Sequence, residues 1–398
     1  MVKDIPTNNQ MSESTLTTSE RELTGAAGLQ AIGIVMPLAS QQGGAEALLQ
    51  HFLRHGEHSY KYVCAFLEDG PLATEVRALG YDTTVFPTTH LSHVSNYLKT
   101  LRSLRSWITA KKLEMVVSWM PKAHMYVSPA AFFLPVQAVW YQHGVPYGHP
   151  MDRLISLFPA AAVLCCSDTS KRGQDQMFPV RQSHVCYPGV ALSSAGSRSK
   201  DEARDCLGLP KTAPIIGMVA RLEHWKGAHI FVEAAPEILT HYPEATMFIV
   251  GGQHPLDVAY AEKVYAMVKE LNLRSQLILA GQRPMNEVPL WHAAADVIVH
   301  PVVGVEPFGM SVVEAMGMGK VVVASDLGGP AEVIENGVNG ILIRGGDPSL
   351  LASTVIQLLE DPPRRVSIEK LAPLRARNFS VDTFAARFNE VMAKLLLA

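Results

Sequence analysis

Short apolar strands alternate with helical segments along this chain, and the alternation runs twice. Short apolar runs separated by helices are typical of parallel strands that are buried on both faces. In the first half the expected strands are Ala31–Met36, Tyr62–Phe66, Thr84–Phe86, Met115–Ser118, Ala138–Tyr141 and Ala162–Cys165. In the second half they are Ile215–Val219, Thr246–Val250, Gln276–Leu279, Val297–Val299, Val321–Ala324 and Ile341–Ile343. The chain is therefore predicted to be an α/β protein with two doubly wound, Rossmann-like domains that face each other across a cleft.

The length of 398 residues suits two domains better than one core. Residues 28–190 are expected to form the first domain and residues 191–379 the second, with a small, polar linker at 191–199. Residues 1–27 are rich in Ser, Thr, Asn and Glu and lack the apolar core of a signal peptide, so a disordered tail is expected there. Residues 380–398 are expected to form an amphipathic helix that packs back on the first domain through Phe384, Phe388, Val391 and Leu395.

Charge and cysteine content argue against several classes of protein. Apolar residues make up 48% of the chain and charged residues 18%, which indicates a folded, soluble protein. A formal net charge of −3 argues against a nucleic-acid partner, which needs a basic surface. The 5 cysteines show no C-x-x-C spacing, so a reduced, cytoplasmic setting is expected and a zinc site is not. The longest apolar run, Val127–Trp140, contains two prolines and is too short to span a bilayer.

The segment 97–112 has two interpretations. Its apolar stripe is flanked by Lys99, Arg102, Arg105, Lys111 and Lys112, a pattern that also occurs in helices lying on a membrane surface. The alternative is a helix that packs on the first sheet through Leu98, Leu101, Leu104 and Ile108 and leaves its basic residues in solvent. The second interpretation is favoured, and the first would give a peripheral membrane contact.

Two glutamates, Glu306 and Glu314, lie eight positions apart after the strand Val297–Val299. The order strand, short loop and helix start presents backbone N–H groups to an anionic ligand. Glu306 is expected in the loop and Glu314 one to two turns into the helix, so each would reach a different part of one bound molecule. A ligand that carries both hydroxyls and phosphate would satisfy these groups together.

Two cations follow the first strand of the second domain. Arg221 and Lys226 lie five residues apart after the strand that contains Gly217, and Gly227 begins the next helix. A bidentate guanidinium and an ammonium point charge together suit a diphosphate. Two solvated surface cations are the simpler alternative, which the Glu306 loop at the same sheet edge disfavours.

The first domain offers weaker signals. Gly43 and Gly44 form a strand-to-helix turn that would let the backbone approach phosphate or sugar closely, although a purely structural turn fits as well. His143 ends a strand and precedes a glycine, which places it toward the cleft, but an isolated histidine is more often structural.

Taken together, these motifs resemble a glycosyltransferase of the GT-B fold, and more narrowly the retaining family 4 enzymes that use nucleotide sugars. The resemblance spans residues 30 to about 380 and rests on Gly217, Arg221, Lys226, Gly227, Glu306, Gly309, Glu314, Gly319, Gly328, Gly329 and Glu332. It implies that Glu306 contacts the donor sugar near its reacting end and that Glu314 holds the nucleotide ribose. It also implies that backbone amides bind phosphate and sugar hydroxyls, namely those of Phe308, Gly309, Met310 and Ser311.

The same resemblance gives Arg221 and Lys226 the task of neutralising the departing diphosphate. It matches Gly43 and Gly44 to the family's glycine turn and His143 to its sugar-contacting histidine. The chain departs from the family at His300, where an aliphatic residue is usual, and at Val302, where a small polar residue is frequent. These departures concern the acceptor, whose identity the sequence leaves open.

The predicted function is retaining transfer of a hexose from a nucleotide diphosphate sugar to a glycan, lipid-linked or small-molecule acceptor. No Asp-x-Asp motif occurs, so neither a metal nor another cofactor is expected, and Arg221, Lys226 and the loop amides would take the metal's place. A nucleotide-sugar epimerase of the same architecture would need acids and bases but no acceptor site. A non-catalytic sugar-binding relative would be expected to have lost Glu306, Arg221 or Lys226, and all three are present.

Overall fold

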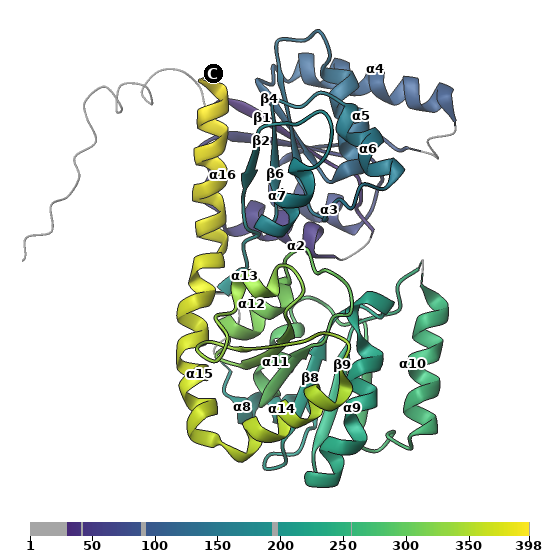
Figure 1. The fold of residues 1–398 in the computed structure, drawn as a ribbon. Coiled ribbons are helices and arrows are strands. Elements are labelled where there is room, and N and C mark those ends of the chain that lie inside the picture. Colours follow the sequence, from purple (N-terminus) through teal and green to yellow (C-terminus); the bar gives the residue numbers. More distant parts are fainter. Residues whose placement is uncertain (1–29, 41–42, 89–92, 193–197, 256, 398) are drawn as a thin grey trace, which may run out of the picture.

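The computed structural model describes residues 30–397 except 41–42, 89–92, 193–197 and 256. The expected tail at 1–27 and most of the expected linker at 191–199 lie outside the described residues. Figure 1 shows two α/β units, one above the other, with the last two long helices running along one side of both. No helix in the described part is long and apolar enough to cross a membrane.

The first unit is built on a seven-stranded parallel sheet with the order β3-β2-β1-β4-β5-β6-β7. The order reverses direction between β1 and β4, as in doubly wound sheets that bind ligands beyond the carboxyl ends of their strands. The strands are β1 (Ala31–Met36), β2 (Lys61–Phe66), β3 (Asp82–Val85), β4 (Met115–Trp119), β5 (Gln137–Gln142), β6 (Ala162–Cys165) and β7 (Ser183–Val185). The helices between them are α2 (Gly44–His55), α3 (Pro71–Ala78), α4 (Val94–Ala110), α5 (Pro121–Ala131), α6 (Pro150–Leu157) and α7 (Asp168–Asp175).

The second unit is built on a six-stranded parallel sheet with the order β10-β9-β8-β11-β12-β13. Its strands are β8 (Ile215–Val219), β9 (Thr246–Val250), β10 (Leu277–Gly281), β11 (Val297–His300), β12 (Val321–Ser325) and β13 (Ile341–Ile343). Its helices are α8 (Lys200–Leu207), α9 (Ala228–His241), α10 (Val258–Glu270), α11 (Val288–Ala294), α12 (Met310–Gly317), α13 (Pro330–Val333), α14 (Pro348–Glu360) and α15 (Pro362–Ala376). Two short 3-10 segments, η2 (His224–Lys226) and η3 (Arg377–Phe379), complete it.

These two sheets confirm the predicted fold class, and every strand expected from the sequence is present to within a few residues. The sequence analysis missed β7, which has three residues, Ser183–Val185, all only partly buried. A strand so short carries no period from which it could be predicted.

Helix α4 (Val94–Ala110) includes all but the last two residues of the segment 97–112, for which two interpretations were considered. Leu104 and Ile108 are buried in the first unit's core, and Leu101 packs against it, whereas Leu98 is 42% exposed. Most of the apolar stripe is thus used in packing on the sheet, as the favoured interpretation expects. Nothing in the described structure supports a membrane contact there.

The final helix α16 (Val381–Leu396) lies along the first unit, beside its helix α2 (Figure 1). Phe384, Phe388, Val391 and Leu395 all join the first unit's core. The Phe384 ring lies 5.3 Å from that of Phe52 in α2 and meets it edge-on. Because α15 packs on the second unit and α16 on the first, the chain crosses back at the short η3 segment.

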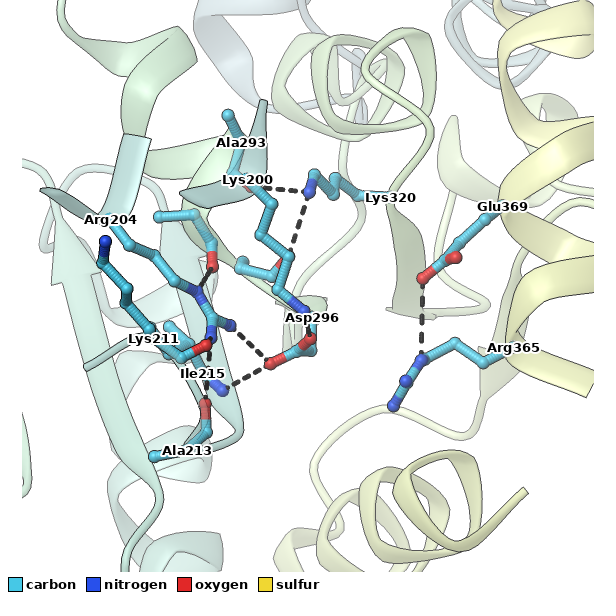
Figure 2. A network of polar contacts seen from close by, with 12 residues as sticks. Lys200, Arg204, Lys211, Ala213, Ile215, Ala293, Asp296, Lys320, Arg365 and Glu369 are labelled. Carbon is cyan, nitrogen blue, oxygen red and sulfur yellow. Dashed lines mark hydrogen bonds and ion pairs between the residues drawn. The ribbon is translucent and has the colours of Figure 1, made fainter. Parts of the chain in front are cut away.

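A buried polar network joins the amino ends of β8 and β11 (Figure 2). The Arg204 side chain is 1% exposed, and its Nη2 lies 2.8 Å from Oδ2 of Asp296, which also accepts the backbone N–H of Ile215 at 2.8 Å. Lys200 contacts the other oxygen of Asp296. A buried ion pair is tolerated when its remaining hydrogen bonds are made, and here backbone carbonyls accept from Arg204 as well. The network fixes the two strands whose opposite ends carry the candidate site.

Candidate active site

The candidate site lies where β8 and β11 end, at the carboxyl edge of the second sheet. The loop after β11 is held by a neighbouring turn, because the backbone N–H of Glu306 donates to Leu327 at 3.1 Å and its carbonyl accepts from Gly329 at 2.8 Å. Gly328 has a φ of 86°, and a Cβ at that residue would lie 2.2 Å from the Glu306 carbonyl oxygen. The Gly328–Gly329 motif is therefore needed for the close approach that positions Glu306.

Helix α12 begins directly after this loop. Gly309 precedes it with a φ of 92° and provides no side-chain cap. The first N–H groups of a helix have no partner within the helix and carry a partial positive charge. The amides of Met310 and Ser311 therefore suit an anion. The Phe308 side chain is 3% exposed and belongs to the core, and the roles of the Phe308 and Gly309 amides stay predictions.

Glu306 forms a buried cluster with Lys226 and His300. Its Oε2 lies 2.5 Å from Nζ of Lys226 and 3.0 Å from Nε2 of His300. Burial alone would raise the pKa of Glu306, but the charge of Lys226 and the hydrogen bond from His300 outweigh it and lower the pKa to about 2. Glu306 is 5% exposed and ionised at neutral pH. Among the described residues, none makes a hydrogen bond or ion pair with its Oε1.

Arg221 follows β8 and pairs with a different carboxylate. Its Nη2 lies 3.4 Å from Oε1 of Glu223, and the same oxygen lies 3.2 Å from Nε2 of His254. The Arg221 side chain is 37% exposed, against 14% for Lys226. Both predicted cations thus lie on the same loop, and each has an acidic partner.

Glu314 lies on the second turn of α12, as expected, with its side chain 26% exposed. Its Oε2 is 3.7 Å from Nε2 of His292, which is buried in α11. Burial lowers the pKa of His51 in the first unit's α2, and the negative charge of Glu314 partly offsets that lowering.

The first unit's glycine turn lies against the start of α12. A Cβ added to Gly44 would lie 3.3 Å from Sδ of Met310, so the two units are in close contact there. Gly43 precedes α2 in an extended conformation, and a Cβ there would lie 2.9 Å from a carboxylate oxygen of Glu46. The predicted glycine turn and the predicted amide-rich helix start therefore face each other across the interface.

His143 lies at the end of β5 in the first unit. Its half-buried ring packs against Tyr141 and Trp119, with ring centroids 4.1 and 5.4 Å away. Its Nε2 is shielded from solvent and has no partner among the described residues. Burial lowers the pKa of His143 to about 3, so the ring is neutral at neutral pH. None of the described contacts joins it to Arg221 or Lys226.

Gly217 is placed differently from the other predicted donor-binding residues. It lies within β8 and is buried, two residues before the strand ends. A Cβ there would lie 2.0 Å from the Phe248 ring. Packing against Phe248 therefore explains why this position has no side chain. The segment after β8 that reaches the site is the loop that begins at Arg221.

Two residues that the sequence analysis did not assign to the site are important in it. His300 was noted only as a departure from the family pattern, yet it contacts Glu306 directly. Glu223 pairs with Arg221. The position of His300 could have suggested its role, because it ends a buried strand just before the loop that carries Glu306. Nothing in the sequence distinguished Glu223 from a surface residue.

Glu332, the last of the residues on which the family resemblance rests, connects the two units through hydrogen bonds. Its carboxylate accepts the backbone N–H groups of Asp168 at 2.8 Å and Thr169 at 2.7 Å, at the start of α7, and the Tyr187 hydroxyl at 3.0 Å. A carboxylate at a helix start is favourable for both its hydrogen bonds and its charge. Among the described residues, no group of acidic, histidine and cysteine side chains is arranged to hold a metal ion.

Comparison with known proteins identifies a matching family model, curated relatives and solved structures of similar fold. Residues 199–375 match the family model of glycosyl transferases group 1. The chain is 31% identical over 216 residues to the D-inositol 3-phosphate glycosyltransferase of Corynebacterium urealyticum, covering 53% of this chain and 51% of that protein. A protein of the same name from Thermobispora bispora is 30% identical over 222 residues, covering 55% and 52%. The chain thus spans about half the length of the curated relatives it matches.

Solved structures resemble most of the chain. Anabaena Alr3699/HepE, crystallised in complex with UDP and glucose, superposes with a TM-score of 0.80 at 23% identity and covers 92% of this chain and 99% of its own. Sucrose-phosphate synthase of Thermosynechococcus elongatus has a TM-score of 0.74 at 18% identity, with the same coverage. At these identities the likeness establishes the fold.

Two doubly wound sheets that superpose on these structures define a protein of the GT-B fold. The match to the glycosyl transferases group 1 family covers residues 199–375 and so lies in the second unit. The epimerase alternative is not favoured, because the relatives are named glycosyltransferases.

Proposed function

We propose that this chain is a retaining glycosyltransferase that moves a hexose from a nucleotide diphosphate sugar to a glycan, lipid-linked or small-molecule acceptor without a metal ion. One observation carries the proposal: a single sheet edge brings together two cations, an ionised buried glutamate and an uncapped helix start. A diphosphate sugar offers charge and hydroxyls to all of these groups. The curated relatives described above are named glycosyltransferases, and a structural neighbour was crystallised with UDP and glucose.

Each group has a role that follows from its charge and place. Glycosyl transfer develops positive charge on the sugar ring and negative charge on the departing diphosphate. Arg221, Lys226 and the amides at the start of α12 would stabilise the departing charge, which is the largest electrostatic contribution available to such a site. Glu306, with Oε1 left open, would hold the sugar, and Glu314 would hold the ribose.

Retention of configuration would follow from attack on the same face from which the diphosphate leaves. The bond from the anomeric carbon to the phosphate oxygen breaks with its electron pair staying on the diphosphate, and the acceptor oxygen bonds to the anomeric carbon. The acceptor proton passes to the departing phosphate oxygen, so no separate base is needed. The first unit, with Gly44 against Met310 and His143 at the end of β5, would present the acceptor and the sugar-side contacts.

A two-stage experiment tests the proposal. Thermal unfolding is followed with UDP, GDP and ADP, since a ligand present at about 100 times its Kd stabilises the folded state by about 2.7 kcal/mol. Nucleotide release is then measured with the sugar forms of whichever nucleotide stabilises, in the presence of excess chelator and with Glu306→Gln as the matched control.

We expect one nucleotide to stabilise and its sugar form to release nucleotide in chelator, with Glu306→Gln slow. Absence of stabilisation by all three nucleotides, together with absence of release, would refute the proposed activity. Loss of release in chelator that only a divalent cation restores would refute its metal independence.

A further inference from the structure

His300 is the buried residue that links the two sides of the candidate donor loop. It ends β11 and is 2% exposed. Its Nε2 lies 3.0 Å from Oε2 of Glu306 in the loop, and its Nδ1 lies 3.5 Å from Oγ of Ser311 in the first turn of α12. One imidazole therefore contacts both the predicted sugar-binding glutamate and a residue of the predicted phosphate-binding helix start.

The chemistry of these neighbours fixes the hydrogen on the ring. An ionised carboxylate only accepts hydrogen bonds, so Nε2 of His300 carries the proton that it donates to Glu306. The contact between Nδ1 and the Ser311 hydroxyl can be made in either direction, since a hydroxyl both donates and accepts. An aliphatic residue, which is usual at this position in family 4, could make neither bond.

Lys226 is the other partner of Glu306, and both contact the same oxygen. If Lys226 turns toward a bound diphosphate, its contact with Glu306 weakens, and Glu306 is only 5% exposed. A buried carboxylate that loses its partner is costly and tends to move or to take up a proton. A second donor that does not bind phosphate would keep the carboxylate where it is.

We propose that His300 is a positioning residue that holds Glu306 ionised and in place while Lys226 engages the diphosphate of the donor. This inference rests on the proposed function, since it assigns His300 a task within that reaction. His300 touches Glu306 and Ser311 and acts through them.

Three substitutions separate the two hydrogen bonds of the ring. His300→Gln places an amide N–H near the position of Nε2 and keeps the bond to Glu306. His300→Asn places an amide near Nδ1 and keeps only the Ser311 side. His300→Leu removes both. His124→Leu is the matched control, because His124 is also fully buried, lies in the first unit and stacks on Trp140.

The probes are UDP for binding and UDP-glucose for turnover, or the nucleotide that the thermal screen selects. We expect His300→Leu and His300→Asn to bind the bare nucleotide within about threefold of the parent but to lower kcat about 10- to 100-fold, the cost of one lost hydrogen bond to a charged group. His300→Gln should return to within about threefold of the parent kcat. His124→Leu should lower the unfolding temperature and leave kcat unchanged.

Equal kcat in His300→Leu and the parent would overturn the inference while leaving the proposed function intact. Equal losses in the Gln, Asn and Leu variants, matched by loss of nucleotide binding, would show a purely structural histidine. A parent that releases no nucleotide would instead contradict the proposed function.

The hydrogen bond between His300 and Glu306 can also be tested by a measurement that does not depend on turnover. In protein labelled with ¹⁵N-histidine, the ring signals that disappear in His300→Gln belong to His300. They should show a ring protonated at Nε2, and they should change in Glu306→Gln. A ring protonated only at Nδ1 would overturn the assignment.

Discussion

Replacing Lys226 with methionine should destabilise the protein and also slow catalysis, because this lysine serves a buried carboxylate before any donor arrives. The Lys226 side chain is 14% exposed, and Glu306 is almost fully buried. The lowering of the Glu306 pKa from 4.5 to about 2 corresponds to about 3 kcal/mol of stability at neutral pH. Methionine fills the space of the lysine stem but leaves the carboxylate with His300 alone.

The pH dependence follows from the direction of that shift. Because the folded pKa lies below the ordinary value, the ionised Glu306 stabilises the folded state above about pH 4.5, and the contribution is lost as the pH falls toward 2. In Lys226→Met the burial of Glu306 should dominate and raise its pKa. The difference in stability between parent and variant should therefore be largest at neutral pH, on the order of 3 kcal/mol, and should shrink as the pH is lowered below 4.5.

Urea unfolding of the parent, Lys226→Met, Arg221→Met and Lys226→Met/Glu306→Gln between pH 3.5 and 7 measures these differences. Arg221→Met is the control, since its partly exposed pair should be worth less than about 1 kcal/mol. The double variant removes both buried charges and should recover most of the lost stability without recovering turnover. Equal stability of Lys226→Met and Arg221→Met at pH 7, or no recovery in the double variant, would refute the reasoning.

Two further predictions concern the glutamate pair and the first unit. Glu314→Gln should weaken binding of the bare nucleotide, whereas Glu306→Gln should leave that binding nearly intact and lower sugar transfer. Calorimetry with UDP measures the affinity of each variant, and equal losses of affinity in both would contradict the separate roles. His143→Ala should spare nucleotide binding and lower transfer by about 1–3 kcal/mol, because the Nε2 of its neutral ring, though shielded from solvent, has no partner among the described residues and a sugar hydroxyl would supply one. Transfer as fast as in the parent would show that the ring only packs against Trp119 and Tyr141.

Much of the fold could be predicted because parallel strands that are buried on both faces of the sheet appear in the sequence as apolar runs. The strands Ala31–Met36, Ile215–Val219 and Thr246–Val250 were expected at their observed bounds. β7 could not be predicted, since its three residues are held by pairing with β6 and not by their own pattern. Register and pairing across the sheet depend on contacts that are distant in sequence.

The positions of the site residues along the chain could be predicted, but their partners could not. Lys226 and Glu306 lie eighty residues apart, and nothing in the sequence indicates that they form an ion pair. Gly217 shows that a glycine of the motif can have a purely structural role. It lies next to the site, but a larger residue there would collide with the Phe248 ring. Only the folded structure separates glycines that make room for a ligand from glycines that make room for a side chain.

Both cations that are expected to meet the diphosphate already have acidic partners, and the two pairs differ. Arg221 contacts Glu223 at 3.4 Å from a partly exposed position, whereas Lys226 contacts Glu306 at 2.5 Å in a buried one. Donor binding is then an exchange of partners, and the net gain for each cation is the attraction to phosphate less the cost of leaving its carboxylate.

That cost is higher for Lys226, because its pair is shorter and less screened by water. Arg221 should therefore contribute more to the affinity for the bare nucleotide, whereas Lys226 should contribute mainly when extra negative charge develops on the departing group. Arg221→Met should accordingly weaken UDP binding more than Lys226→Met does, while both lower kcat by about 100-fold. Calorimetry and turnover on the same preparations test this order, and weaker UDP binding by Lys226→Met than by Arg221→Met would mean that the lysine leaves Glu306 without appreciable cost.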